Sequence, residues 1–171
     1  ALKKLKSKDI ATVTYVGPDD VANLLTCFNE LKDKVDPSKV KIIFRRQRNQ
    51  DTLVDTNWLK NKLANLGFDN GYSERNHHDA WDKCDLIVDT YTAMLWDSEP
   101  ASMRDEIKNR VDCLEQNGQL VLVFPIKQEH FSGNLGPDLA NQIEGVIDEI
   151  LDQEDELKKI ATNSIGNSLY V

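Results

Sequence analysis

Polar residues with useful chemistry follow several apolar segments of this 171-residue chain, each at the point where the apolar run stops. The four groups are residues 17–20, 45–46, 76–81 and 89–92, and they contain glycine, arginine, histidine, tryptophan, aspartate and tyrosine. In parallel α/β sheets, ligands bind beyond the carboxyl ends of the strands. If the apolar segments are such strands, the four groups belong to one binding region.

The apolar segments have the composition of β-strands. β-branched and aromatic residues dominate them, and turn residues bound them. The strand candidates are residues 10–16, 40–44, 84–89 and 120–124, with shorter ones near Tyr72 and at 168–171. Because the longer candidates are almost continuously apolar, we expect a mostly parallel sheet that helices cover.

Helical patterns separate these strands, with apolar residues recurring every three or four positions. The helix candidates are residues 21–31, 58–66, 100–114 and 139–150. Gly67 stands where a C-terminal cap belongs. We expect a polar loop over residues 45–55, and Asn117 with Gly118 to end the third helix.

The composition is that of one ordinary globular domain and disfavours several partner classes. A net charge of −8 repels a nucleic-acid backbone. No apolar run reaches the ~20 residues that cross a bilayer, and three cysteines without a Cys-x-x-Cys pair favour a reducing, cytoplasmic compartment. We expect residues 1–171 to form a single domain, and a start at Ala1 is compatible with a fragment of a larger protein.

Two stretches of the sequence carry motif-like residues. Residues 13–18, Val-Thr-Tyr-Val-Gly-Pro, run from a strand into a glycine turn. Residues 82–89, Asp-Lys-Cys-Asp-Leu-Ile-Val-Asp, are followed by a helix and then by residues 114–123, which lead into the strand candidate at 120–124. Together they resemble the class I S-adenosylmethionine-dependent methyltransferases over about residues 10–124. The resemblance implies an α/β, Rossmann-like, doubly wound and mostly parallel sheet with helices on both faces.

The same resemblance implies S-adenosylmethionine as a small-molecule cofactor. Gly17, Pro18 and Asp19 fall on the turn that lines its methionine end. Asp79 and Trp81 match the residue types that hold the adenine amino group and pack on its ring. A carboxylate such as that of Asp19 suits a cofactor with an ammonium and a sulfonium, and it disfavours a pyrophosphate at the helix N-terminus.

The residues after the segment that resembles the fourth strand are the candidates for the methyl acceptor side. Asp89 could act as a base or orient the acceptor, and Tyr91 could shape an apolar acceptor pocket. The implied function is a transferase that moves a methyl group to an unidentified acceptor.

Departures from the family leave other interpretations open. Gly17 alone represents a turn that usually has several glycines, and Arg45 stands where an acidic residue usually accepts hydrogen bonds from the ribose. The alternative is a catalytically inactive domain that serves as a scaffold or interaction module for a protein partner or for other domains of a larger chain. In a third interpretation, an NADP-type binder pairs a phosphate with Arg45 and Arg46. His77 and His78 point opposite ways in extended backbone, so no metal site is expected.

Overall fold

The computed structural model divides the chain into two compact units. The first consists of Ala1–Val88 and Cys113–Leu120, and the second consists of Asp89–Asp112 and Val121–Val171. The structure describes Leu5 and residues 8–17, 21–46, 55–76, 79–90, 100–125, 139–154, 158, 163–165 and 168–170. The expectation of a single domain over residues 1–171 stays a prediction.

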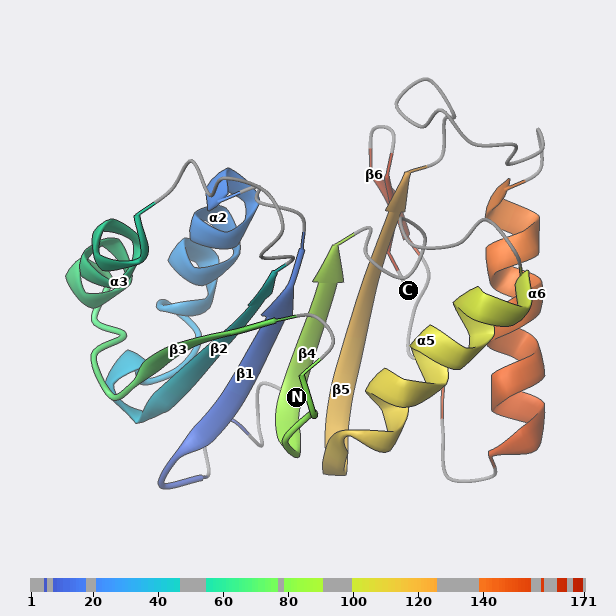
Figure 1. Cartoon of the computed structure of the whole chain (residues 1–171), viewed down its shortest axis with the longest axis horizontal. Helices are drawn as coiled ribbons and strands as arrows, with labels where there is room; N and C mark the ends of the chain where they lie inside the picture. Colours follow the sequence, from blue (N-terminus) through green and yellow to red (C-terminus); the bar gives the residue numbers. More distant parts are fainter. Residues whose placement is uncertain are drawn as a thin grey trace. The chain divides into compact units, whose positions relative to one another are not determined.

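A parallel sheet with the strand order β3-β2-β1-β4-β5 forms the centre of the first unit (Figure 1). Its strands are β1 (Ala11–Val16), β2 (Val40–Arg46), β3 (Tyr72–Asn76), β4 (Cys84–Thr90) and β5 (Leu114–Pro125), the last two of which run on into the second unit. Val13 pairs with Ile42 between β1 and β2, and Phe44 pairs with Glu74 between β2 and β3. Because these three strands are parallel, their carboxyl ends share one edge of the sheet.

The strands β1, β2 and β4 are buried along almost their whole length. Such burial requires apolar side chains toward both faces, which explains why the sequence of these strands does not alternate. Tyr15 of β1 and Phe44 of β2 pack with ring centroids 6.0 Å apart. The strands expected at residues 10–16, 40–44 and 84–89, and the shorter one near Tyr72, are confirmed.

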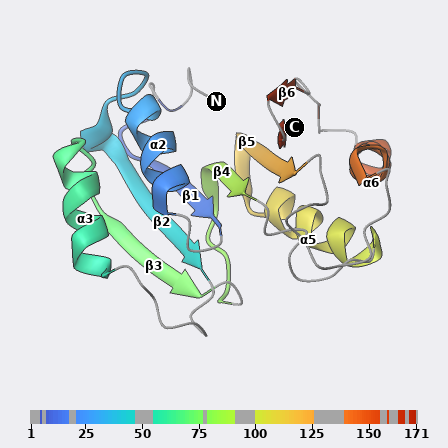
Figure 2. The same ribbon diagram turned by 90° about the horizontal axis from the view of Figure 1, so that it is seen from above.

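Two helices, α2 (Val21–Leu31) and α3 (Thr56–Asn65), pack beside one another in this unit, and a short 3-10 turn, η1 (Pro37–Lys39), precedes β2 (Figure 2). The buried residues of α2 recur at helical spacing and are Val21, Leu24, Phe28 and Leu31. The ring of Phe28 meets that of Phe68 edge-on, with centroids 5.1 Å apart.

Local capping fixes both ends of α3. The Asp55 carboxylate accepts a hydrogen bond of 2.8 Å from the Asn57 N–H, which satisfies a donor of the first turn. Gly67 follows the helix at φ +92°, the left-handed conformation that glycine adopts most easily. The predicted C-terminal cap at Gly67 is therefore confirmed.

The second unit combines two helices with a small antiparallel extension of β5. The helices are α5 (Pro100–Asp112) and α6 (Leu139–Gln153), and two ion pairs connect α5 to α6 and to the residue that follows α6. Arg104 Nη1 lies 2.9 Å from Glu149 Oε1, and Lys108 Nζ lies 2.7 Å from Glu154 Oε1. The strands β6 (Asn163–Ile165) and β7 (Ser168–Tyr170) form a hairpin, and β7 pairs antiparallel with the end of β5.

Two expectations about element boundaries were wrong. Arg45 and Arg46 belong to β2 and are buried, where the sequence predicted the start of a polar loop. Asn117 and Gly118 do not end a helix, because α5 already stops at Asp112 and both residues lie within β5. Asn117 has φ +61°, a left-handed conformation that asparagine tolerates, so its turn-like character is real although the element is a strand.

The observed order of elements confirms the predicted α/β, Rossmann-like class with a mostly parallel sheet. The expected last strand is confirmed as β7, whereas the three-residue strand β6 was not expected from the sequence. Among the described helices, none has both the length and the apolar character that crossing a membrane requires.

Gly118 packs too closely against main-chain atoms to accept a side chain. A Cβ at this position would lie 2.8 Å from the Glu115 carbonyl oxygen and 3.2 Å from those of Cys84 and Asp85. We expect Gly118→Ala to lower the free energy of unfolding by about 1–3 kcal/mol, because backbone must shift to relieve the overlap. Urea denaturation followed by circular dichroism measures the change.

Gly145 provides the matched control for this substitution. It lies in α6, and nothing comes within 4 Å of a Cβ built there. Gly145→Ala should therefore raise stability by about 0.5–1 kcal/mol through helix propensity alone. Equal effects of the two substitutions would contradict the close packing at Gly118.

Candidate functional site

The turn after β1 and the end of β2 are joined by main-chain contact. Gly17 directly follows β1 and is buried. Its N–H donates a hydrogen bond of 3.3 Å to the carbonyl oxygen of Arg45. Pro18 and Asp19, the other residues predicted for this turn, lie outside the described residues, so their role in cofactor binding stays a prediction.

The side chain of Arg45 extends from β2 into the loop that precedes β4. Only 1% of the residue is exposed. Its Nη1 donates to the carbonyl oxygens of Asn76 at 3.1 Å and Asp79 at 2.9 Å, and its Nη2 donates to that of Ala80 at 2.6 Å. Backbone carbonyls, rather than a carboxylate, therefore surround this guanidinium group.

An aromatic ring completes the surroundings of Arg45. The guanidinium carbon lies 4.3 Å from the centroid of the Trp81 ring, within the range of a cation–π interaction. Trp81 is half-buried and packs against the core cluster of Val16, Cys84 and Ile87. One part of the indole is thus fixed by the core and by Arg45, and another part reaches the surface.

Asp79 forms a hydrogen-bonded turn with Asn76 in the same loop. Its carboxylate accepts a hydrogen bond of 2.8 Å from the Asn76 N–H, and its own N–H donates to the Asn76 carbonyl at 3.2 Å. The Asp79 residue remains exposed. The structure therefore brings Arg45, Asp79 and Trp81 together, and the main chain of Arg45 adds Gly17 to the group.

Burial lowers the pKa of Arg45, and the nearby carboxylates of Asp79 and Asp82 act in the opposite direction. An arginine nevertheless keeps its proton in proteins. The loop from Asn76 to Trp81 is therefore built around a permanent positive charge, which the carbonyl dipoles and the indole face stabilise.

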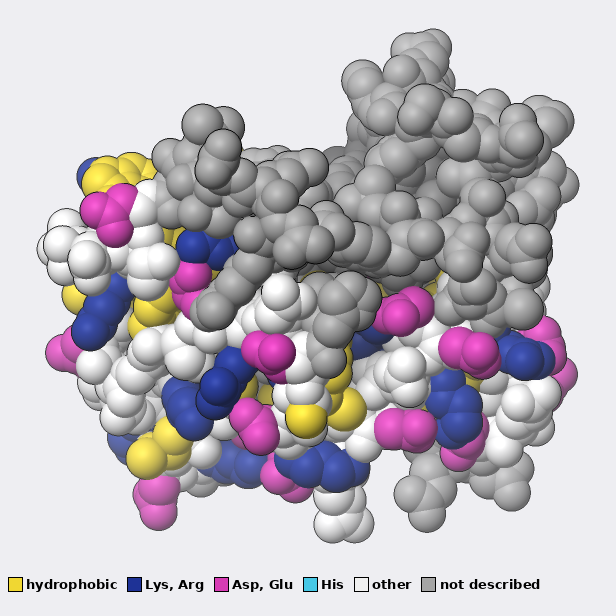
Figure 3. All heavy atoms as spheres, in the orientation of Figure 1, with side chains coloured by type: hydrophobic (Ala, Val, Ile, Leu, Met, Phe, Trp, Pro, Cys, Tyr) yellow, Lys and Arg dark blue, Asp and Glu magenta, His cyan; other side chains and the backbone are white. Residues whose placement is uncertain are grey.

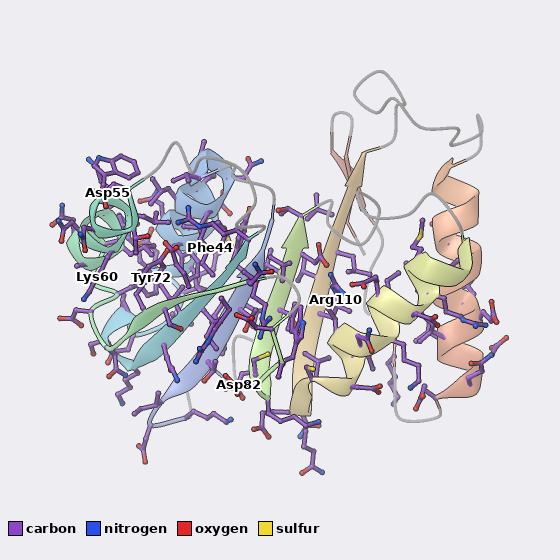
Figure 4. The ribbon with its side chains drawn as sticks, viewed as in Figure 1. Phe44, Asp55, Lys60, Tyr72, Asp82 and Arg110 are labelled. Atoms are coloured by element: carbon purple, nitrogen blue, oxygen red, sulfur yellow. The ribbon has the colours of Figure 1, made fainter. Side chains whose placement is uncertain are left out.

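Arg46 points to the opposite face of β2, as alternation in a strand requires. It forms an ion pair of 2.5 Å with Glu74 and donates to the Thr56 hydroxyl at 3.3 Å. Tyr72 donates a hydrogen bond of 2.7 Å to Glu74, and burial together with this bond raises the pKa of Tyr72 (Figure 4). Because Arg45 and Arg46 lie on different faces, the geometry gives no support to a phosphate site that uses both.

In the second unit, Asp89 forms a buried ion pair with Arg110 of α5, which is labelled in Figure 4. Arg110 Nε donates to Asp89 Oδ2 at 2.5 Å, and both side chains are 1% exposed. Arg110 Nη1 donates to the Glu106 carboxylate and, at 2.8 Å, to the Glu106 carbonyl. Tyr91 lies outside the described residues, so a catalytic role for Asp89 and Tyr91 stays a prediction.

Sequence reasoning missed the partners of these charged residues. The sequence predicts a helix that contains Arg110 and a strand motif that contains Asp85, but no charged partner for either residue. Asp85 accepts a hydrogen bond of 3.0 Å from the Thr12 N–H and pairs with Lys8 at 2.5 Å, which ties the start of β1 to β4. The available signal was a charged residue inside an otherwise apolar strand, since such a residue needs a partner.

Cysteine and metal chemistry receive no support from the described residues. Within these parts of the chain, no group of three or more His, Cys, Asp or Glu residues is placed to hold a metal ion. Burial raises the pKa of Cys27 to about 11, the charge of Glu30 adds to this effect and that of Lys34 opposes it. A thiol with this pKa stays protonated near neutral pH, so Cys27 is a poor nucleophile.

The raised pKa of Cys27 gives a testable pH dependence. In the folded chain, alkylation of Cys27 by iodoacetamide at pH 8 should be about a hundredfold slower than in urea, where an ordinary thiol is partly ionised. The folded pKa lies above the unfolded one, so the stabilising contribution is present at neutral pH and is lost as pH rises from about 9 to 11. Peptide mass spectrometry measures the rates, and equal rates in both states would contradict the assignment.

The Asp89–Arg110 pair predicts a large stability effect in the second unit. Arg110→Met leaves a carboxylate buried without its guanidinium and should lower the free energy of unfolding by about 3–5 kcal/mol. Arg104→Met on the same helix removes an exposed pair with Glu149 and should cost less than about 1 kcal/mol. Chemical denaturation compares the two variants, and a similar loss in both would contradict the burial of the pair.

No protein-family model and no curated protein matches the sequence. Solved structures match its fold. The chain is similar to an O-methyltransferase family 2 protein from Planctomyces limnophilus in complex with apigenin, with a TM-score of 0.62 and 11% identity over 94% of this chain and 49% of that one. It is also similar to a SAM-dependent methyltransferase from Aquifex aeolicus, with a TM-score of 0.52 and 23% identity over 99% of this chain and 85% of that one.

PigF with SAH is a further match, with a TM-score of 0.50 and 10% identity over 99% of this chain and 52% of that one. The chain thus spans about half the length of PigF and of the Planctomyces protein. At these identities a match reports the fold, because unrelated activities share folds. The chain has the fold of the class I S-adenosylmethionine-dependent methyltransferases.

Proposed function

We propose that this chain binds S-adenosylmethionine and belongs to a methyltransferase with an unidentified acceptor. The observation that carries the proposal is the agreement in fold. A solved SAM-dependent methyltransferase and the SAH complex of PigF each align with 99% of the chain. SAH, S-adenosylhomocysteine, is what remains of the cofactor after methyl transfer, so a domain of this fold accommodates that ligand.

The residues of the first unit fit parts of this cofactor. Gly17 places main chain without a side chain at the turn after β1, which permits close approach of a ligand. The exposed carboxylate of Asp79 and the half-buried indole of Trp81 offer an acceptor and a flat apolar surface, which suit an aminated aromatic ring. At the end of β2 stands Arg45, which donates hydrogen bonds, whereas the ribose hydroxyls would need a hydrogen-bond acceptor there. The residues therefore suit the adenine and methionine ends of the cofactor, but not its ribose.

In the proposed mechanism the protein acts mainly by positioning. The bound cofactor supplies a methyl group on a sulfonium, so the chain has to align the acceptor with it. Gly17, Pro18 and Asp19 line the methionine end, and Asp79 and Trp81 hold the adenine. Asp89 and Tyr91 face the acceptor, and the bond from Arg110 fixes the orientation of the Asp89 carboxylate, which favours orienting over proton removal.

The charges and the cysteines of the chain support the proposed partners and location. On the face in Figure 3, the described Lys and Arg side chains lie among Asp and Glu side chains rather than in one basic patch, which disfavours a nucleic-acid partner. All three cysteines are free, which agrees with a reducing, cytoplasmic location. Because the chain spans about half of some matching structures, further domains of a longer chain or a protein partner could supply the acceptor site.

Ligand-dependent stability tests the proposal. With free S-adenosylhomocysteine at about 100 times its dissociation constant, the free energy of unfolding should rise by about 2.7 kcal/mol. Differential scanning fluorimetry and isothermal titration calorimetry measure the shift and the affinity. NADP should give no shift, since Arg45 and Arg46 lie on opposite faces of β2.

Substitutions of glycine locate the ligand in the same experiment. Gly17→Val should remove the shift, because a side chain at this buried turn blocks close approach of the ligand. Gly145→Ala, on the exposed face of α6, should leave the shift unchanged. A wild-type chain without any shift from S-adenosylmethionine or S-adenosylhomocysteine would refute cofactor binding and leave the scaffold as the function.

A further inference from the structure

Arg45 is bonded in a way that only an arginine side chain permits. Two guanidinium nitrogens contact three carbonyl oxygens, and the carbon of the same group lies over the Trp81 ring. A lysine has three donors on one nitrogen and no flat surface, so it cannot bridge the carbonyls and stack at once. The geometry thus depends on the shape of the group as well as on its charge.

The bonds from Arg45 hold one end of a segment whose other end is attached to the core and to β5. Trp81 packs against the cluster of Val16, Cys84 and Ile87, and Lys83 Nζ donates to the Leu114 carbonyl at 3.3 Å. Residues 79–83 form no helix or strand, and Asp79 and Ala80 are exposed. Within the segment, the contacts between Asp79 and Asn76 form a local turn. The three bonds to Arg45 connect that turn to β2, across 31 to 35 residues of sequence.

The main chain of Arg45 extends the connection to the turn after β1. The Gly17 N–H donates to the Arg45 carbonyl, while the side chain of Arg45 reaches Asn76, Asp79 and Ala80. One residue therefore contacts both loops for which the proposed function needs fixed positions. The burial of the guanidinium keeps its charge within the protein and away from direct contact with a ligand.

We infer that Arg45 is a positioning residue for the nucleoside end of the site. Instead of contacting the ribose at the end of β2, its buried side chain holds Asp79 and Trp81 in the orientation in which they contact the adenine. The inference rests on the proposed function. It also predicts the opposite of what the family resemblance predicts for an acidic residue at position 45. Introducing an acidic residue at position 45, as the resembled family usually has, should weaken nucleoside binding because it leaves the carbonyls facing a buried carboxylate.

Affinity measurements with two probes test the inference. Arg45→Lys keeps the charge but not the fork, and it should weaken binding of S-adenosylhomocysteine and of adenosine by about tenfold or more, the effect of losing one to two charge-assisted hydrogen bonds. Arg45→Glu should weaken both probes at least as much. Isothermal titration calorimetry measures the affinities, and thermal melting confirms that each variant is folded.

Arg46→Met is the control for a general loss of stability. Arg46 is an adjacent buried arginine in the same strand, but it forms an ion pair with Glu74 of β3 and donates to the Thr56 hydroxyl of α3. The variant should be less stable than wild type, yet its affinity for both probes should change by less than about twofold, since the ion pair and hydrogen bond that it removes lie on the other face of β2. This comparison separates positioning from structural damage.

Hydrogen exchange supplies a readout that needs no ligand. In Arg45→Lys, amides of Asn76 and residues 79–83 should exchange about tenfold faster than in wild type, and in Arg46→Met they should not, because the loop loses its bonds to β2 only in the first variant. Unchanged exchange and unchanged affinity in a folded Arg45→Lys would overturn the inference, as would tighter binding by Arg45→Glu.

A wild-type chain that binds neither probe would refute both the proposed function and the role of Arg45 in ligand binding. The hydrogen-exchange rates would still decide whether Arg45 holds the loop.

Discussion

The buried guanidinium of Arg45 is the contact on which the ligand-facing part of the first unit depends. A charge that leaves water is tolerated only when polar partners surround it closely. Three carbonyl oxygens and an indole ring supply these partners, so the loop before β4 has to lie against the end of β2. The position of Trp81 and the turn at Asp79 follow from this requirement, and the Gly17 turn is attached to the same residue through the main chain.

The second unit meets the same requirement with different chemistry. Arg110 is as deeply buried as Arg45, but the carboxylates of Asp89 and Glu106 neutralise it, and its bond to a carbonyl goes to Glu106 of its own helix. Carbonyl partners belong to the main chain, so they constrain the path of a loop. Carboxylate partners belong to side chains, so the contact with Arg110 fixes the side-chain conformations of residues on a helix and a strand rather than the path of the main chain. The fixed orientation of Asp89 is therefore a consequence of how α5 is held, whatever the acceptor chemistry is.

Local patterns predicted the elements, whereas distant contacts determined the site. The spacing of Val21, Leu24 and Phe28 and the glycine at position 67 were enough to predict α2 and the end of α3. The burial of Arg45 could not be predicted, because its partners lie 31 to 35 residues away and are main-chain atoms without a sequence signature. Asn117 and Gly118 indicated a turn correctly, but the strand that contains them was decided by pairing and by contact with the carbonyls of Cys84 and Asp85. Of the predicted cofactor residues, those in the described part of the chain are mutually connected, and their role in binding is untested.

The strand β3 stands at the end of the sheet order in the first unit and leaves one row of main-chain groups without a neighbouring strand in that order. Such an edge can template pairing with another copy of a protein. β3 has only five residues, carries an exposed Arg75, and directs Glu74 inward to Arg46. A short edge strand with a charged side chain on each face is a poor template for the addition of a strand from another copy, so the ion pair at the end of β2 has a second consequence at the edge of the sheet.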